Sequence, residues 1–284
     1  MKLSIKFLLF LLPLCIVIGI NIYYLNQNQI NKFDKHATYF IGSSRVQRGI
    51  DPQLLNDNKE ENKIYNFGIS SSTFFHNIIL AKHLIIKHKA KELFIELSPI
   101  IHSYHPAPES LNMVITSMTA AIKYLSINGY IEYVESYLFT RLSLKTTLKK
   151  LIQYNGDSLD KIGYRFNDKN KYYTTDSFLK IEDLEMKTDD DLSEYFDLIL
   201  QLTQLAKKQN TKIRFFLPLT FQRKQEREIV STIFNRLPNE QKVKYTEDFL
   251  NSISNADNLY DKNHFNNKGA KIMTTYFKNA YFTD

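Results

Sequence analysis

Short apolar runs alternate along the chain with longer stretches in which apolar residues recur at helical spacing. Four runs, each ending at or just before a Gly or Pro, read ATYFIG, KIYNFG, ELFIEL and KIRFFLP. Such runs predict buried strands at 37–42, 63–68, 92–97 and 212–218. Because helical patterns separate the strands, we expect an α/β fold: a three-layer αβα sandwich around a parallel, flavodoxin-like sheet.

Amphipathic patterns predict the covering helices. In residues 71–88, Ile78, Ala81 and Ile85 recur on one side, and the histidines at 76, 83 and 88 are expected to be solvated. The same periodicity predicts helices at 190–209, 222–236 and 266–282. Asp51-Pro52 has the form of a helix N-cap followed by an N1 proline, and 243–250 is expected to be a short last strand. Residues 105–190 break the alternation and are interpreted as a helical and irregular insertion.

The N-terminal segment differs from the rest. Lys2 and Lys6 precede an apolar stretch over 7–24, and no small-residue cleavage site follows it. We therefore expect 1–28 to be a cytoplasmic stub, an uncleaved signal-anchor and a tether, so that one transmembrane helix precedes a domain at 29–284. A cleaved signal peptide is the alternative, and both readings export the domain. The expected location is the bacterial cytoplasmic (inner) membrane, with a single pass through the bilayer at residues 7–24 and most of the chain outside.

Composition narrows the class of protein. The chain has 284 residues, of which 43% are hydrophobic and 24% charged, which excludes a disordered chain. A single cysteine excludes a disulfide scaffold and cysteine-based metal sites. Lys and Arg total 37 against 30 Asp and Glu, but they are interleaved along the chain. With export, this favours a solvated surface, or contact with anionic lipids or envelope polymers, over nucleic acid. No cofactor or metal is expected.

The candidate chemistry lies where strands end. Ser44 follows the first strand, Gly68 ends the second, and Asp261 and His264 precede the last helix. Because sites in parallel α/β sheets form beyond the carboxyl ends of strands, these residues are expected to meet. A serine needs a neutral imidazole as its base, and the imidazole needs a carboxylate to fix its tautomer. The backbone N–H groups of Ser44 and Gly68 are candidate oxyanion donors.

Each piece alone is common, since Gly-Ser-Ser occurs in ordinary turns and Asp-x-x-His at helix starts. In order and location, however, the set resembles the SGNH (GDSL-like) hydrolase superfamily. IGSS at 41–44 matches the first block with Ser44 as nucleophile, although Ser43 replaces the usual Asp. Asn66-Phe67-Gly68 matches the second block and Asp261 with His264 the last. The third block, normally Gly-x-Asn-Asp, is replaced by Glu96-Leu97-Ser98-Pro99.

One branch of that superfamily is more similar. FIGSSRVQRGIDPQLL at 40–55, ELSP at 96–99 and the N-terminal anchor resemble the DltD type. The resemblance implies an anchored extracytoplasmic protein that works beside a membrane-bound O-acyltransferase and helps acylate an envelope polysaccharide or a teichoic-acid-like polymer. It implies a serine esterase or O-acyltransferase.

Two alternatives stay open: a catalytically reduced accessory protein that docks to the acyltransferase, and a free-standing secreted esterase or lipase. Arg45, beside the nucleophile, is expected to bind an anionic group of the substrate or to form a structural salt bridge. His102 and His105 follow the third strand and are expected to line the substrate pocket rather than to bind metal.

Overall fold

The computed structural model describes the part of the chain that holds the candidate chemistry. The described residues are 11–13, 15–17, 19, 34–56, 63–70, 72–101, 164, 178–180, 192–221 and 223–282. The chain divides into two compact units, and residues 34–103 with 159–284 form the larger one. All structural statements below concern this larger unit unless they name others.

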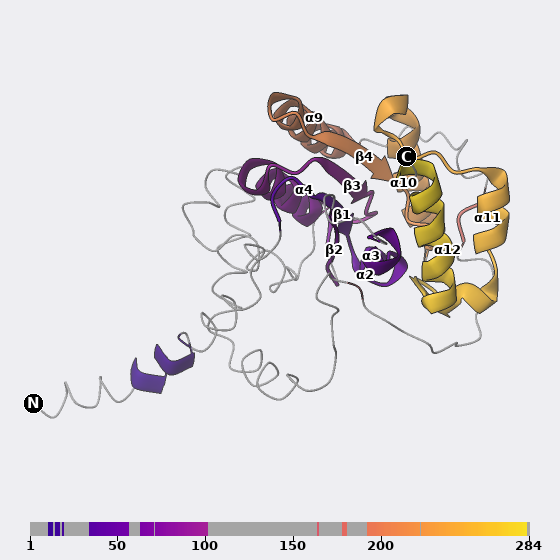
Figure 1. The fold of residues 1–284 in the computed structure, drawn as a ribbon, viewed down its shortest axis with the longest axis horizontal. Coiled ribbons are helices and arrows are strands. Elements are labelled where there is room, and N and C mark those ends of the chain that lie inside the picture. The colour runs from indigo at the N-terminus through magenta and orange to yellow at the C-terminus, as the bar shows by residue number, and fades with distance from the viewer. Residues whose placement is uncertain are drawn as a thin grey trace, which may run out of the picture. The chain divides into compact units, whose positions relative to one another are not determined.

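A four-stranded parallel sheet forms the centre of the larger unit (Figure 1). Its strands are β1 (Thr38–Gly42), β2 (Ile64–Gly68), β3 (Glu92–Glu96) and β4 (Lys212–Phe216), in the order β2-β1-β3-β4. The expected α/β class and the four expected strands are confirmed, and the order agrees with a flavodoxin-like layout. Because all four strands run parallel, their carboxyl ends share one edge of the sheet.

Helices cover both faces of this sheet. On one face, Phe74 of α4 (Phe74–His83) packs against Phe215 of β4 and against Tyr195 of α9 (Ser193–Lys208). On the other face, the ring of Phe277 in α12 (Asn267–Phe277) contacts one phenylalanine on each of two strands. Its centroid lies 5.0 Å from that of Phe40 in β1 and 5.5 Å from that of Phe94 in β3. Figure 1 shows α4 and α9 on one side and α12 on the other. Alternation along each strand therefore buries two aromatic layers, as two covered faces require.

Short elements connect and extend this framework. They are α2 (Ser44–Gly49), α3 (Pro52–Leu55), the π-helix η2 (Leu84–His88), α10 (Lys224–Arg236), η5 (Asn239–Gln241), α11 (Glu247–Ile253), η6 (Ala256–Asn258), the hairpin strands β5 (Leu259–Asp261) and β6 (His264–Phe265), and the π-helix η7 (Lys278–Phe282). Asp51 caps α3 as expected, since its side chain accepts from the Gln53 N–H.

Two local predictions are wrong. Residues 243–250 do not form a strand: the Val243 N–H donates to the Phe215 carbonyl, and the chain then turns into α11. The Thr246 side chain caps α11 by accepting from the Phe249 N–H, and this cap ends any extended run. The histidines at 76, 83 and 88 are not solvated, because each is at most 8% exposed.

Several expectations fall mainly outside the described residues. Of the apolar segment 7–24, positions 11–13, 15–17 and 19 are described, and they are helical. Within the described part of the chain, no helix is both long enough and apolar enough to cross a bilayer. Most of the expected insertion at 105–190, together with His102 and His105, also lies outside the described residues.

Candidate active site

Ser44 lies on a tight turn at the carboxyl edge of the sheet. β1 ends at Gly42, Ser43 is the N-cap of α2, and Ser44 is the first helical residue. The Ser43 side chain accepts from the Arg45 N–H, which fixes the turn. A Cβ at position 42 would overlap Val46 and Glu96, so only glycine allows this strand-to-helix connection. The Ser44 side chain stays partly exposed and accessible.

Gly68 is placed by close packing against the same helix. A Cβ at position 68 would overlap the backbone nitrogen of Gln47, so β2 and α2 approach each other only because residue 68 is glycine. The Gly68 N–H donates to Asn66 Oδ1 at 2.7 Å. The expectation that this N–H is offered to an oxyanion therefore differs from the structure, where the Asn66 side chain holds it. The Asn66 amide also donates to the Val46 and Ile50 carbonyls and so ties α2 to β2.

Asp261 and His264 face each other across the β5–β6 hairpin, which precedes α12. They are register partners in this antiparallel pair. Asp261 Oδ1 accepts from the backbone N–H groups of Asn263 at 2.8 Å and His264 at 3.0 Å, which closes the turn on the carboxylate. Thr220 holds the hairpin tip by donating to the Asn263 carbonyl at 2.6 Å. These contacts hold the Asp261 carboxylate in a fixed orientation toward His264.

The structure brings Ser44, His264 and Asp261 into one hydrogen-bonded chain. Ser44 Oγ lies 2.7 Å from His264 Nε2, and His264 Nδ1 lies 2.7 Å from Asp261 Oδ1. An ionised carboxylate only accepts, so Nδ1 carries the ring proton and donates to Asp261. Nε2 is then the acceptor for the Ser44 hydroxyl, which is the arrangement that a serine nucleophile requires.

The surroundings favour the charge states that this arrangement needs. Burial lowers the pKa of His264, and the positive charges of Arg48 and Arg45 lower it further, although Asp261 opposes them. His264 is therefore neutral near pH 7 and able to take a proton. Burial alone would raise the pKa of Asp261, but hydrogen bonds from the Asn263 backbone and from His264 outweigh it and hold that pKa below its usual value.

Glu96 is a site residue that the sequence did not identify. It ends β3, and its side chain is 0% exposed beneath the Ser43–Ser44 turn. Its carboxyl accepts from the Ser43 N–H at 2.6 Å and from Ser43 Oγ at 3.0 Å. Burial raises the pKa of Glu96, while Arg45 and Ser43 partly offset that effect. The role of Glu96 becomes visible only in the structure, where β3 pairs directly with β1.

Arg45 links the serine turn to the histidine hairpin. Its guanidinium donates to Asn263 Oδ1 at 3.2 Å and lies 3.8 Å from Glu96 Oε1 and 3.6 Å from Glu226 Oε2. These contacts agree with the structural salt bridge, one of the two roles expected for this residue. Through Glu96 and Asn263, Arg45 couples the two halves of the hydrogen-bonded chain.

One of the two expected oxyanion donors, the Gly68 N–H, is occupied because it donates to Asn66 Oδ1. The neighbouring Ile69 N–H is occupied as well, since it donates to the Gly42 carbonyl at 2.8 Å. The Ser44 N–H is the first amide of α2, and an amide at that position has no acceptor within its own helix. It is the expected donor that the geometry still offers.

Comparison with known proteins adds no family. Neither the family models nor the curated proteins contain a match to this sequence. Function is therefore inferred from the geometry of Ser44, His264 and Asp261.

Proposed function

We propose that this chain is a membrane-anchored, extracytoplasmic serine esterase or O-acyltransferase of the SGNH type. Its proposed substrate is an acyl ester of a cell-envelope polysaccharide or teichoic-acid-like polymer, and its proposed partner is a membrane-bound O-acyltransferase. The observation that carries the proposal is the chain of two 2.7 Å contacts from Ser44 through His264 to Asp261. Its position at the carboxyl edge of a parallel sheet supports the same reading.

The proposed chemistry uses these side chains in a fixed order. His264 Nε2 takes the hydroxyl proton as Ser44 Oγ attacks the acyl carbonyl carbon, and Asp261 stabilises the resulting imidazolium. The imidazolium then gives its proton to the leaving oxygen of the donor, which leaves an acyl group on Ser44. An acceptor hydroxyl reverses these steps, and the acyl group passes to the polymer or, where water is the acceptor, is released as the acid.

A catalytically reduced accessory protein is the second candidate. The engagement of the Gly68 N–H by Asn66 favours it, because one expected oxyanion donor is then unavailable. Removing a single oxyanion donor lowers turnover by about 10²–10³-fold in other serine enzymes. A partner that supplied a donor would therefore restore much of the turnover.

The test replaces Ser44 by alanine in the full chain within its host cell. Ester-linked acyl groups on the envelope polymers are released with mild base and quantified, and the level of the variant is measured by immunoblot. The enzyme proposal expects acylation to disappear at a normal protein level, because Ser44 Oγ is the atom that carries the acyl group in the proposed steps. Normal acylation in this variant contradicts it and supports the accessory role.

A matched control is Ser70→Ala. Ser70 is an exposed serine just beyond β2, and its hydroxyl donates to Gln47 Oε1 at 3.0 Å. It resembles Ser44 in chemistry and lies beyond the neighbouring strand, but it has no part in the hydrogen-bonded chain. We expect acylation to stay normal in this control.

A further inference from the structure

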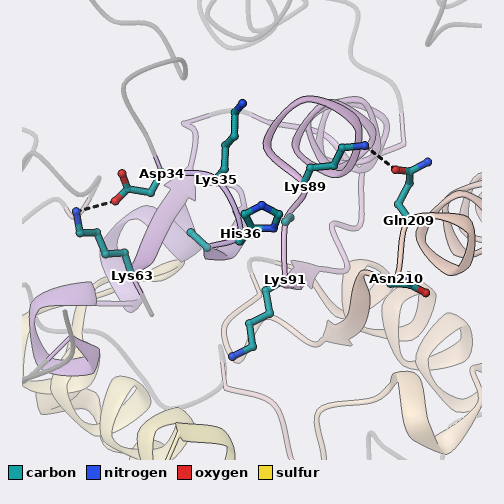
Figure 2. Close-up of a pocket in the computed structure, with 10 residues that line it drawn as sticks. Asp34, Lys35, His36, Lys63, Lys89, Lys91, Gln209 and Asn210 are labelled. Carbon is teal, nitrogen blue, oxygen red and sulfur yellow. Dashed lines mark hydrogen bonds and ion pairs between the residues drawn. The ribbon is translucent and has the colours of Figure 1, made fainter. Parts of the chain in front are cut away.

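The edge of the sheet opposite Ser44 carries an open cavity of about 700 Å³ (Figure 2). The residues that line it come from the segments just before β1, β2, β3 and β4. Its charged and imidazole-bearing members are Asp34, Lys35, His36, Lys63, Lys89 and Lys91. A five-residue strand spans about 13 Å, which sets the minimum separation from the Ser44 edge.

Positive charge is concentrated at this edge. The described residues just before the four strands, together with the first residue of each strand, include two carboxylates, Asp34 and Glu92, and eight lysines: Lys35, Lys63, Lys87, Lys89, Lys91, Lys207, Lys208 and Lys212. Eight lysines and two carboxylates give these described residues a formal charge of +6. Lysines that are far apart in the sequence thus meet at one edge, because each lysine cluster precedes a different parallel strand.

The backbone at the cavity is held in an unusual conformation. His36, Lys89 and Asn210 have φ values of 62°, 52° and 55°, and they are the left-handed non-glycine residues among those the structure describes. All three line the cavity. Glycine is the usual residue at the left-handed position after a helix, and a lysine there gives up backbone stability. At Lys89 the chain keeps a cation where glycine would fit the backbone better.

Hydrogen bonds and an ion pair hold the wall of the cavity in place. The His36 N–H donates to the His88 carbonyl, and the Lys91 N–H donates to the Ala37 carbonyl. Lys63 pairs with Asp34 at 2.7 Å, and Lys89 donates to Gln209 at 2.9 Å, as Figure 2 shows. The view in Figure 2 shows Lys35, Lys63, Lys89 and Lys91 around His36. Several ammonium groups are therefore presented together on a fixed frame.

We propose that this basic edge, centred on the cavity, binds the headgroups of anionic phospholipids at the membrane surface. Charge complementarity supports a phosphate-bearing partner. The length of chain outside the described residues supports a bilayer in particular. Nine residues, 25–33, separate the apolar segment 7–24 from Asp34, and Asp34 lines the cavity. Nine extended residues span about 32 Å at most. The membrane anchor of the proposed function, on which this step rests, therefore keeps this edge near the lipid surface. The Ser44 edge then faces away from the bilayer, toward envelope polymers.

The experiment places the full chain in nanodiscs of phosphatidylcholine alone or of phosphatidylcholine mixed equally with phosphatidylglycerol. Lysines are acetylated briefly with a water-soluble reagent, and each site is quantified by mass spectrometry. The probes are Lys35, Lys63, Lys89 and Lys91. Lys262 and Lys268 are the internal controls, because they lie in the hairpin and helix beside the Ser44 edge.

We expect the four probe lysines to be protected several-fold by phosphatidylglycerol, and the two controls to label equally in both discs. Protection should disappear in concentrated salt, because screening shortens the range of the attraction to a few ångströms. Equal labelling in both discs overturns the proposal, as does a chain that fails to associate with the anionic discs. If glycerol phosphate added to the neutral discs protects the same lysines equally well, the site binds a soluble phosphate and the lipid assignment is wrong.

A charge-reversal pair gives a second measurement that does not depend on labelling chemistry. In Lys35→Glu/Lys91→Glu, co-sedimentation with phosphatidylglycerol vesicles should weaken and depend less steeply on salt, whereas Lys262→Glu/Lys268→Glu should behave like the wild type. Each basic residue at a membrane surface contributes roughly a fivefold effect on association. Identical salt dependence in both pairs contradicts the proposal. Neither pair alters the Ser44 chain, so this result is independent of the proposed catalytic function.

Discussion

At the scale of single residues, His264 sets the protonation state on which the candidate chemistry depends. Burial lowers its pKa below the usual value near 6.5, with Arg48 and Arg45 as further causes. Only the neutral ring accepts the Ser44 proton, so reactivity should rise with pH through the His264 pKa and reach its plateau at a lower pH than an ordinary histidine would give. The rate of fluorophosphonate labelling of Ser44, measured against pH, checks this.

Arg48→Gln tests the cause of that shift. Removing a positive charge near the ring should raise the pKa of His264, so the acid limb of the labelling profile moves to higher pH while the plateau rate changes little. Lys262→Gln is the control, because Lys262 also lies near His264 in sequence, whereas the positive charges that lower the pKa of His264 are those of Arg48 and Arg45. An unmoved acid limb in Arg48→Gln would show that the charge of Arg48 does not lower the pKa of His264.

Ser43 and Glu96 explain a departure from the sequence pattern. The SGNH pattern proposed for this chain usually has Asp before the nucleophile. Here that residue is Ser43, and the buried Glu96 carboxyl accepts from its N–H and its Oγ. Ser43→Asp would put two carboxyls within hydrogen-bond distance in a dry site. We expect it to lower the free energy of unfolding by roughly 3 kcal/mol.

The same substitution in a Glu96→Gln background should cost much less, since only one carboxyl remains. Urea unfolding of the two single variants and the double variant closes a thermodynamic cycle. Additive effects would mean that the two positions do not compete for one carboxylate site.

At the scale of elements, the position of Ser44 depends on how closely α2 packs on the strands. Gly68→Ala would drive a Cβ into the backbone of Gln47, and backbone cannot rotate away. We expect α2 to shift, the unfolding free energy to fall by about 2 kcal/mol or more, and Ser44 labelling to slow sharply. Circular dichroism melting and labelling measure the two effects.

Gly49→Ala is the comparison for that variant. A Cβ at position 49 would meet the Phe265 ring at 3.3 Å, and a ring edge can yield by a few tenths of an ångström. It should therefore cost less stability and leave labelling closer to normal. Equal losses in both variants would mean that α2 is not held at Gly68.

Element prediction from sequence worked where one physical signal dominated. The four strands were predictable because each is a buried apolar run that ends at a breaker, as KIYNFG ends at Gly68. Residues 243–250 were not, because an apolar and polar alternation there competes with the Thr246 cap, and the cap prevailed. The β5–β6 hairpin was missed for a related reason: it consists of only two short strands closed by the Asp261 side chain.

At the scale of the whole molecule, the buried His83 makes the free energy of unfolding depend on pH. Burial, with the nearby charges of His88 and Lys87, lowers the pKa of His83 from 6.5 to about 4. The unfolded chain binds this proton more readily, so His83 contributes stability that is present above pH 6.5 and lost as the pH falls to about 4. The loss is about 3 kcal/mol. His83→Leu should flatten that part of the dependence of unfolding free energy on pH, as measured by urea titration. An unchanged slope would contradict this assignment.

Some residues of the candidate site could be predicted from the sequence, and others could not. Ser44, Asp261 and His264 could be predicted because their order and their places beside the predicted strands and the last helix together resemble a known serine-hydrolase pattern. Glu96 could not, because its role depends on the β1–β3 neighbourhood and on a buried side chain that sequence does not place. The segregation of lysines to one edge was hidden for the same reason: it arises only when four strands align in parallel.

The most direct test of the account is covalent labelling of the full chain with a fluorescent fluorophosphonate, alongside Ser44→Ala and His264→Ala. We predict one labelled serine, identified as Ser44 by peptide mass, with labelling abolished in Ser44→Ala and greatly slowed in His264→Ala. Ser70→Ala should label like the wild type. A folded chain that does not react, or one that reacts equally in all variants, would contradict an assembled Ser44–His264–Asp261 triad.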